Sequence, residues 1–348
     1  MRRFDYSFLK TGNIPANLVE LFAGIYSLKE KDTSRKSRFG TVYSELEKIA
    51  KVQSIKGSNA IEGIVTTDER IHAIVNQNSA PLNHDEQEIA GYRDALNLVH
   101  TTFNNLSFNE KTLFDLHRAM LTEAKPDVAG RYKSEDNIIM EIRSDGTKRV
   151  RFEPIPATET KEAMEQLILA YMDARDDYGV NQLLLIPCVV LDFLCIHPFS
   201  DGNGRMSRLL SLLLLYKNGF DAGKYISFEE QINKNKGYYY EALRKSSIGW
   251  HENKNDYFFF VSNFLMTLLS CYRELDKRFA TVNSKKINKT SRIEATVSNS
   301  LVPISKKEIC EILPDISTST VELVLSKMVK EEKVIKIGQS TNTRYYRK

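Results

Sequence analysis

The sequence predicts a mainly α-helical protein that carries one β-hairpin and ends in a small basic module. Apolar residues recur at the i, i+3, i+4 and i+7 spacing of a helix face along most of 1–280. One segment, 137–152, instead shows two short strand-like stretches around an Asp-Gly pair. After this helical part the chain becomes polar and then basic. We therefore expect a helical body, one hairpin and a separate C-terminal module.

The helical stretches follow one another with short connections. In 40–61 the apolar stripe runs through Val42, Leu46 and Ile49. The segment 107–110 has the sequence of a capping box and predicts a helix start just behind it. The helices predicted in this way cover 15–28, 40–61, 84–103, 113–121, 156–178, 183–196, 206–216, 238–246 and 257–279.

The predicted hairpin is the one interruption of this helical pattern before the tail. Asp145-Gly146 suits its tight turn because glycine accepts a positive φ. An isolated two-stranded hairpin is marginally stable in water, so we expect it to lie against the helical body.

Composition excludes several classes of protein. With 42% hydrophobic and 27% charged residues, the chain is neither disordered nor collagen-like. Its four cysteines form no C-x-x-C pair and predict reduced thiols in a cytoplasmic protein. No apolar stretch follows the charged N-terminus, so no signal peptide is expected. The most apolar segment, 183–196, is shorter than the ~20 residues of a membrane span.

The net charge of +4 hides an uneven distribution. Residues 285–348 hold 13 Lys and Arg against 7 Asp and Glu, a net charge of +6, and the rest of the chain is close to neutral. Capping boxes at Ser305 and Ser319 predict two helices, and 334–337 and 343–346 predict two strands. This order of elements is typical of a winged-helix module, which contacts either DNA or another protein.

The segment 197–208, HPFSDGNGRMSR, lies between two apolar helices and has the features of an anion site. Pro198 disfavours helix at His197, so the preceding helix ends there. Gly202 and Gly204 let the chain turn with its N–H groups facing inward. A helix N-terminus follows at once and favours negative charge.

The side chains of the same segment extend this interpretation. Arg205 and Arg208 share one face of the first helical turn and suit a di- or triphosphate. Asp201 beside the phosphates is a natural Mg²⁺ ligand. His197 at the mouth of the loop can take a proton from a hydroxyl. A lone histidine is usually structural, but this combination within twelve residues favours chemistry.

The segment resembles the signature of the Fic family, H-x-F-x-[DE]-G-N-G-R-x-x-R, at every fixed position. The resemblance implies the helical Fic fold and transfer of AMP from ATP to a protein hydroxyl. It makes His197 the general base, Asp201 the Mg²⁺ ligand and Phe199 a buried anchor. The hairpin becomes a flap, about 138–152, along which a target protein lies as an added strand. The ATP-binding positions that it implies are Gly202, Asn203, Gly204, Arg205, Met206, Ser207, Arg208, Asn235 and Tyr239.

Two of these positions come from a second, weaker match. The segment 235–243, NKGYYYEAL, resembles the family's N-[RK]-x-x-Y-Y-x-x-L, so Asn235 and Tyr239 or Tyr240 would line the nucleoside pocket. An aromatic helix face packed in the core explains the tyrosines equally well.

A third match lies upstream of the signature. The segment 58–63, SNAIEG, fits the family's inhibitory pattern [ST]-x-x-x-E-[GN]. Ser58 and Glu62 are four residues apart on one helix face, so the serine can orient the carboxylate. The resemblance implies that Glu62, followed by Gly63, pairs with Arg208 in the place of the γ-phosphate.

These matches define the predicted organisation. It consists of an N-terminal helical region, 1–105, a Fic core, 106–280, a linker, 281–290, and the winged-helix module, 291–348. The predicted function is an autoinhibited protein adenylyltransferase that modifies Ser, Thr or Tyr of a target or of itself, and a homo-oligomer is compatible with this architecture. Transfer or removal of another phosphate-containing group, or a nucleotide-sensing DNA-binding regulator, are the alternatives.

Overall fold

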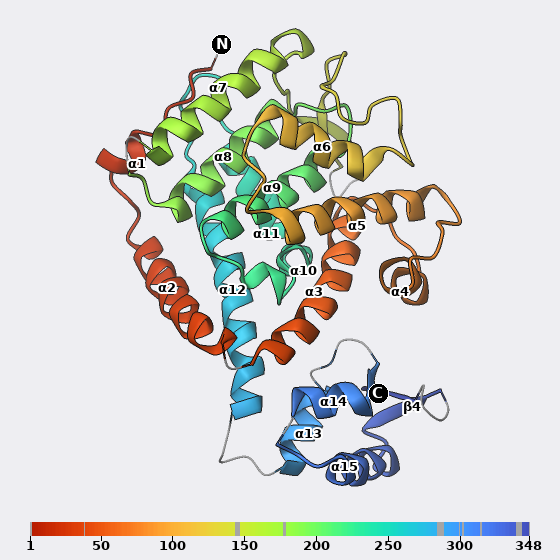
Figure 1. The fold of residues 1–348 in the computed structure, drawn as a ribbon. Coiled ribbons are helices and arrows are strands. Elements are labelled where there is room, and N and C mark those ends of the chain that lie inside the picture. The colour runs from red at the N-terminus through yellow and green to blue at the C-terminus, as the bar shows by residue number, and fades with distance from the viewer. Residues whose placement is uncertain are drawn as a thin grey trace.

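Figure 1 shows a computed structural model in which a helical body stands above a small C-terminal module, with the long helix α12 running from one to the other. The N-terminus lies at the far end of the body from this module. The structure describes residues 2–37, 39–142, 147–176, 179–283, 289–298, 300, 303–313, 315–338 and 343–347.

Two apolar helices, α8 (Gln182–Ile196) and α9 (Asn203–Lys217), form the centre of the body. Both are buried on nearly all sides, which fits sequences that are apolar around the whole helix. They are joined by the loop that begins the segment 197–208, so this loop starts and ends on buried helices.

The N-terminal helices wrap around this pair. Helix α3 packs against α10, α2 packs against α12, and α5 packs against α6. Their bounds are α1 (Phe8–Thr11), α2 (Asn17–Lys36), α3 (Gly40–Ile61), α4 (Asp68–Asn76), α5 (His84–Thr102) and α6 (Glu110–Leu121).

The rest of the body completes the core. Its elements are β1 (Ile139–Ile142), β2 (Lys148–Phe152), α7 (Ala157–Asp176), a short 3-10 helix (Ala222–Lys224), α10 (Phe228–Lys234), α11 (Lys236–Ser246) and α12 (Phe258–Asn283). Strands β1 and β2 pair antiparallel with Glu141 opposite Arg149, as the hairpin prediction requires. The predicted Asp145-Gly146 turn lies outside the described residues.

A buried carboxylate fastens the chain's N-terminal segment to α8. Asp192 accepts hydrogen bonds from Tyr6 Oη at 2.7 Å and from Trp250 Nε1 at 2.6 Å, and Tyr257 Oη donates at 2.9 Å. Arg2 approaches it at 3.4 Å as an ion pair. The start of the chain is therefore part of the core that positions α8.

One hydrophobic core spans the body, because buried residues from Phe4 to Phe279 belong to a single cluster. The predicted regions 1–105 and 106–280 thus share their core. Among the described residues no helix combines the length and apolar character needed to cross a bilayer. The predicted cytoplasmic placement stays a prediction.

The C-terminal module has a hydrophobic cluster of its own. Its strands form a sheet in the order β3-β5-β4. Its elements are α13 (Lys289–Ser298), β3 (Ile304–Ser305), α14 (Lys306–Ile312), α15 (Thr318–Lys330), β4 (Val334–Ile337) and β5 (Arg344–Arg347). The two predicted helices and two predicted strands are present, while the winged-helix assignment and its contact with DNA or protein stay predictions. Residues 284–288 of the predicted linker lie outside the described residues.

Two predicted helix starts are wrong. Helix α6 is capped by Asn109, whose side chain accepts from Thr112 N at 2.8 Å, and the predicted box at 107–110 does not form around Ser107. Helix α15 is capped by Ser317 rather than Ser319. In each case a second side chain with the same capping ability lies two residues away. The box at Ser305 is confirmed.

A close crossing of α5 and α6 yields a first prediction. A Cβ at Gly91 would lie 1.9 Å from the backbone oxygen of Met120. We expect Gly91→Ala to destabilise the fold by at least about 2 kcal/mol, because backbone must move to admit the methyl group. The measurement is the urea midpoint of unfolding. Gly40→Ala, which meets no atom within 4 Å, is the matched control and should lose no stability. An unchanged midpoint for Gly91→Ala would contradict the crossing geometry.

A candidate nucleotide-phosphate site

The signature loop begins and ends on left-handed residues. His197 ends α8 with φ 53°, and Gly202 precedes α9 with φ 76°. Because α9 starts at Asn203, the N–H groups of its first turn have no acceptor within the helix. The predicted turn and helix N-terminus are therefore present in the structure.

Side chains on both sides of the loop fix its shape. The Asn203 amide accepts from Phe199 N at 2.9 Å and donates to Phe199 O at 2.7 Å. The Phe199 ring stacks on His117 with ring centroids 3.8 Å apart. Asn203 thus braces the loop with its side chain.

His117, on α6, is a second brace. Its Nδ1 accepts from Gly130 N at 2.9 Å, so its Nε2 carries the proton and donates to Asp201 O at 3.0 Å. Burial lowers the pKa of His117 to about 4, which keeps the ring neutral. This histidine lies outside the signature in the sequence, and the structure shows that it holds the signature loop.

His197 has the protonation state of a base. Its Nδ1 lies 3.2 Å from Leu194 O, an acceptor, so Nδ1 carries the proton and Nε2 keeps a lone pair. Burial lowers the pKa of His197 to about 4, and the positive charges of Lys133 and Arg151 act in the same direction. The ring can therefore accept a proton at neutral pH.

The loop opens on a cavity of about 1000 Å³, large enough for a nucleotide. The flap strands, α8, the loop and α11 all contribute to its walls. The predicted site residues that line it are Glu62, His197, Asp201, Gly202, Asn203, Gly204, Arg205, Arg208 and Tyr239.

Other predicted positions do not line the cavity. Met206 is buried inside α9, and Ser207 Oγ donates to Gly204 O at 2.7 Å within the helix. Asn235 Nδ2 donates to Gln231 O at 3.1 Å, away from the cavity, whereas its neighbour Lys236 lines it. The contacts of these three residues with ATP stay predictions. Ser58 and Gly63 also lie outside the lining.

Arg208 is fully buried and is held by the end of α3. Its Nε donates to Ser58 Oγ at 2.8 Å, and its Nη2 donates to Ser58 O at 3.0 Å and to Glu62 Oε1 at 2.7 Å. Burial alone would lower the pKa of Arg208, but Glu62 holds it above its usual value. The expected contact between Glu62 and Arg208 is present. Ser58, however, binds the guanidinium and was expected to orient the carboxylate.

Glu62 lies directly over the start of α9. A Cβ at Gly204 would come within 2.3 Å of Glu62 Oε1, so only glycine leaves room for this carboxylate. Lys236 Nζ donates to Ile61 O at 2.6 Å and closes the C-terminus of α3 from the opposite side. The carboxylate thus occupies the position at which an anion would meet the helix N-terminus.

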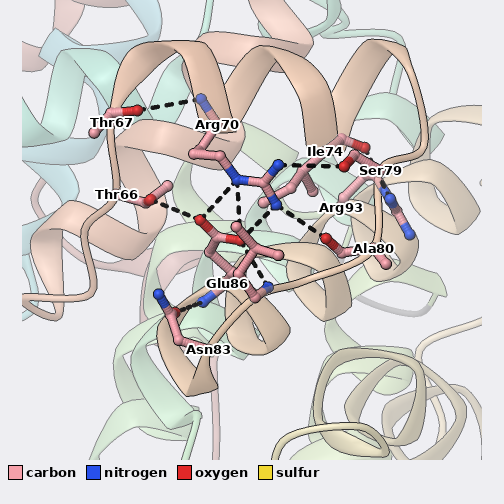
Figure 2. Close-up of polar contacts among 10 residues, drawn as sticks. Thr66, Thr67, Arg70, Ile74, Ser79, Ala80, Asn83, Glu86 and Arg93 are labelled. Atoms are coloured by element: carbon pink, nitrogen blue, oxygen red, sulfur yellow. Dashed lines mark hydrogen bonds and ion pairs between the residues drawn. The ribbon is translucent and has the colours of Figure 1, made fainter.

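Figure 2 shows how the segment behind Glu62 is fastened to α5. Glu86 accepts from Arg70 Nη2 at 2.7 Å, from Thr66 Oγ1 at 2.9 Å and from Leu82 N at 2.9 Å. The hydrogen bonds from Arg70 hold the pKa of Glu86 at about 2. The chain on both sides of α4 is therefore tied to the body, and this limits how far the end of α3 can move.

A chain of charges lies on the other side of the loop. Lys125 forms ion pairs with Asp201 and, at 3.0 Å, with Glu88 Oε1. Glu88 Oε2 in turn lies 2.5 Å from Arg205 Nη2. Sequence analysis missed Lys125 and Glu88, because neither belongs to a recognisable motif and both lie far from the signature segment in the chain.

Aromatic rings line the far end of the cavity. Tyr239 is buried, and the Tyr240 ring lies 5.5 Å from the Arg151 guanidinium and 5.8 Å from Lys236 Nζ. Arg151 comes from β2, so the flap and α11 meet at this ring. Both interpretations of the tyrosines therefore apply to Tyr239, which is packed in the core and also faces the cavity.

The residues present fit a nucleoside triphosphate. Arg205 Nε and Nη1 are buried without a hydrogen-bond partner, as donors awaiting an anion would be. Mg²⁺ would fit here only together with the nucleotide. Among the described residues, no three acidic, cysteine or histidine side chains are grouped so that they could hold a metal ion. Asp201 alone would need phosphate oxygens as further ligands.

Comparison with known proteins agrees with this site. The Fic/DOC family model matches residues 107–215. A protein adenylyltransferase Fic of Nematostella vectensis is 30% identical over 209 residues, covering 58% of this chain and 44% of that protein. The protein adenylyltransferase fic-1 of Caenorhabditis elegans is 27% identical over 141 residues, covering 39% of this chain and 25% of that protein. The chain spans less than half the length of these curated relatives.

Solved structures show the same fold. A Fic family protein from Desulfovibrio desulfuricans G20 gives a TM-score of 0.63 at 21% identity, over 97% of both chains. Fic-1 of C. elegans gives 0.55 at 16% identity, over 75% of this chain and 72% of that one. The chain thus has the fold of solved Fic family structures. Residues 107–215, which include the signature loop, match the Fic/DOC family model.

The two depressed histidine pKa values give a second prediction. In protein labelled at histidine Cε1, NMR titration should give midpoints near pH 4 for His117 and His197. Because the unfolded chain protonates near its ordinary pKa of about 6.5, stability should fall as pH drops from 6.5 towards 4. Single substitutions to Gln assign the two signals. Midpoints near 6.5 in the folded protein would contradict the burial of these rings.

Proposed function

We propose that this protein is an adenylyltransferase that moves AMP from ATP to a Ser, Thr or Tyr hydroxyl of a target protein or of itself. The observation that carries the proposal is the assembled loop, in which a neutral His197 faces the same cavity as the α9 N-terminus and two arginines. The names of the Nematostella and C. elegans relatives support the same reaction class.

The triphosphate would bind at the start of α9. The N–H groups of its first turn, together with Arg205 Nε and Nη1, would donate hydrogen bonds to the β-phosphate. Arg208 supplies the charge for the γ-phosphate once Glu62 leaves it. Asp201 would hold Mg²⁺ together with phosphate oxygens, and the metal would neutralise charge on the leaving group.

Proton transfer falls to His197. Its Nε2 takes the proton of the target hydroxyl as the oxygen attacks the α-phosphorus, and the bond from that phosphorus to the bridging oxygen of pyrophosphate breaks. Pyrophosphate leaves towards Arg205 and Arg208, whose charges offset the negative charge that develops there. The imidazolium then releases its proton to water, which restores the neutral ring.

The flap supports the expected docking of a target strand. Because β1 and β2 form a two-stranded sheet among the described residues, each strand has an edge with free backbone groups. Ile138, Met140 and Val150 are exposed there, which gives an added strand apolar side chains to pack on. Met140 also lines the cavity, so a strand on this hairpin would lie beside the site.

Autoinhibition would follow from competition for Arg208. Glu62 forms an ion pair with the guanidinium and lies against Gly204, where a γ-phosphate would bind. The carboxylate stays one-third exposed at the end of a helix, so it can leave without unfolding α3. ATP would bind in a productive pose only after this exchange.

Removal of Glu62 tests this proposal. We expect Glu62→Gly to raise auto-labelling by radiolabelled ATP at least about tenfold. The substitution frees Arg208 to bind the γ-phosphate, and one hydrogen bond between charged groups changes a binding constant by about that factor. His197→Ala in the Glu62→Gly background should reduce labelling to the level of the blank. The measurement is label incorporated per protein under Mg²⁺.

Two controls make the result specific. Glu69→Gly removes an exposed glutamate from the first turn of α4, outside the cavity, and should label like the wild type. Label in the γ-position of ATP should not be incorporated, because pyrophosphate leaves. Absence of labelling by Glu62→Gly would exclude adenylyl transfer as the activity.

A further inference from the structure

Lys125 lies at the one carboxylate of the signature loop. Its Nζ forms ion pairs with Asp201 Oδ2 and with Glu88 Oε1, the latter at 3.0 Å. The other oxygen of Asp201, Oδ1, accepts from Gly202 N at 2.5 Å. Both oxygens of the expected metal ligand are therefore engaged by the chain itself.

Glu88 holds the Lys125 ammonium in place through an ion pair. Its carboxylate is buried, on α5, and pairs through Oε2 with Arg205 Nη2 at 2.5 Å and through Oε1 with His84 Nε2 at 3.1 Å. Burial would raise the pKa of Glu88, but Arg205 and Lys125 hold it below its usual range, so it stays charged. The result is a fixed anion that keeps a lysine at the loop.

The ammonium of Lys125 is placed to do more than join two carboxylates. It lines the same cavity as His197 and Arg208, and its side chain is 35% exposed. An ammonium has three donors, and the two carboxylates take two of them, which leaves one N–H for a phosphate oxygen. Lysine thus puts a positive charge where phosphates and metal would meet.

We infer that Lys125 is a built-in cation of the nucleotide site, which supplies part of the positive charge that the phosphates would otherwise draw from Mg²⁺. The inference rests on the nucleotide site of the proposed function and adds a binding residue to it. When a metal binds Asp201, Lys125 keeps Glu88 as its partner and remains beside the phosphates. Without metal, Lys125 alone neutralises Asp201 and lets the triphosphate approach.

The test compares nucleotide binding with and without metal. The probe is a non-transferable ATP analogue, titrated calorimetrically in Mg²⁺ and in EDTA. Glu62→Gly is the parent, because it frees Arg208. The measured quantity is the ratio of the dissociation constant in EDTA to that in Mg²⁺, for the parent, Lys125→Met and Lys125→Arg.

We expect the ratio to rise at least about tenfold in Lys125→Met, because the loss of one charged hydrogen bond falls mainly on the metal-free complex. Lys125→Arg, which keeps the charge, should stay within about threefold of the parent. Glu69→Gly in the same background is the remote control and should leave the ratio unchanged.

Each other outcome overturns the inference. Equal weakening in both buffers would give Lys125 a structural role only, and two unchanged dissociation constants would show that its charge does not reach the phosphates. Either result with auto-labelling intact leaves the proposed function standing. Absence of binding by the parent in both buffers would overturn the inference and the proposed function together.

Discussion

The site depends on the buried guanidinium of Arg208, which keeps its charge and therefore needs an anion beside it in every state. In this structure the anion is Glu62, and Ser58 accepts from Nε and from Nη2 of the same guanidinium. A phosphate is also an anion with acceptor oxygens, so under the proposed function it would replace the carboxylate. The end of α3 must consequently be held in place, which explains the donor from Lys236 and the tie of the following segment to α5 (Figure 2).

The same helix also meets the C-terminal module. Val42, Leu46 and Ile49, near the start of α3, share a small cavity with Ile304 and Ile312 of that module. Helix α14 packs against α3, while Ser58 and Glu62 lie at or just beyond its other end (Figure 1). One unbroken helix of 22 residues therefore joins the module to the site. The basic tail, which the charge distribution alone had separated from the signature loop, is in contact with the helix whose far end binds Arg208.

What the sequence could predict depended on whether the residues are neighbours in the chain. The long amphipathic helices and the contiguous segment 197–208 were accessible, because periodicity and a dense motif are local signals. Short α4 and α10 were missed, since so few residues show no period. His117, Lys125 and Glu88 were missed as parts of the site because only folding brings them to Asp201 and Arg205. Asn235 does not line the cavity, because a local match says nothing about which way a helix cap points.

The two signature arginines, one helical turn apart, have different partners for a physical reason. Arg205 pairs with Glu88, whose side chain is 4% exposed, and breaking such a pair would strand a buried charge. Arg208 pairs with Glu62, whose side chain is 32% exposed at a helix end, so water can take over the carboxylate when it leaves. Burial of the acidic partner thus decides which arginine is permanently fixed and which can exchange its anion. Under the proposed function, a phosphate site that is both preorganised and inhibited would need one arginine of each kind.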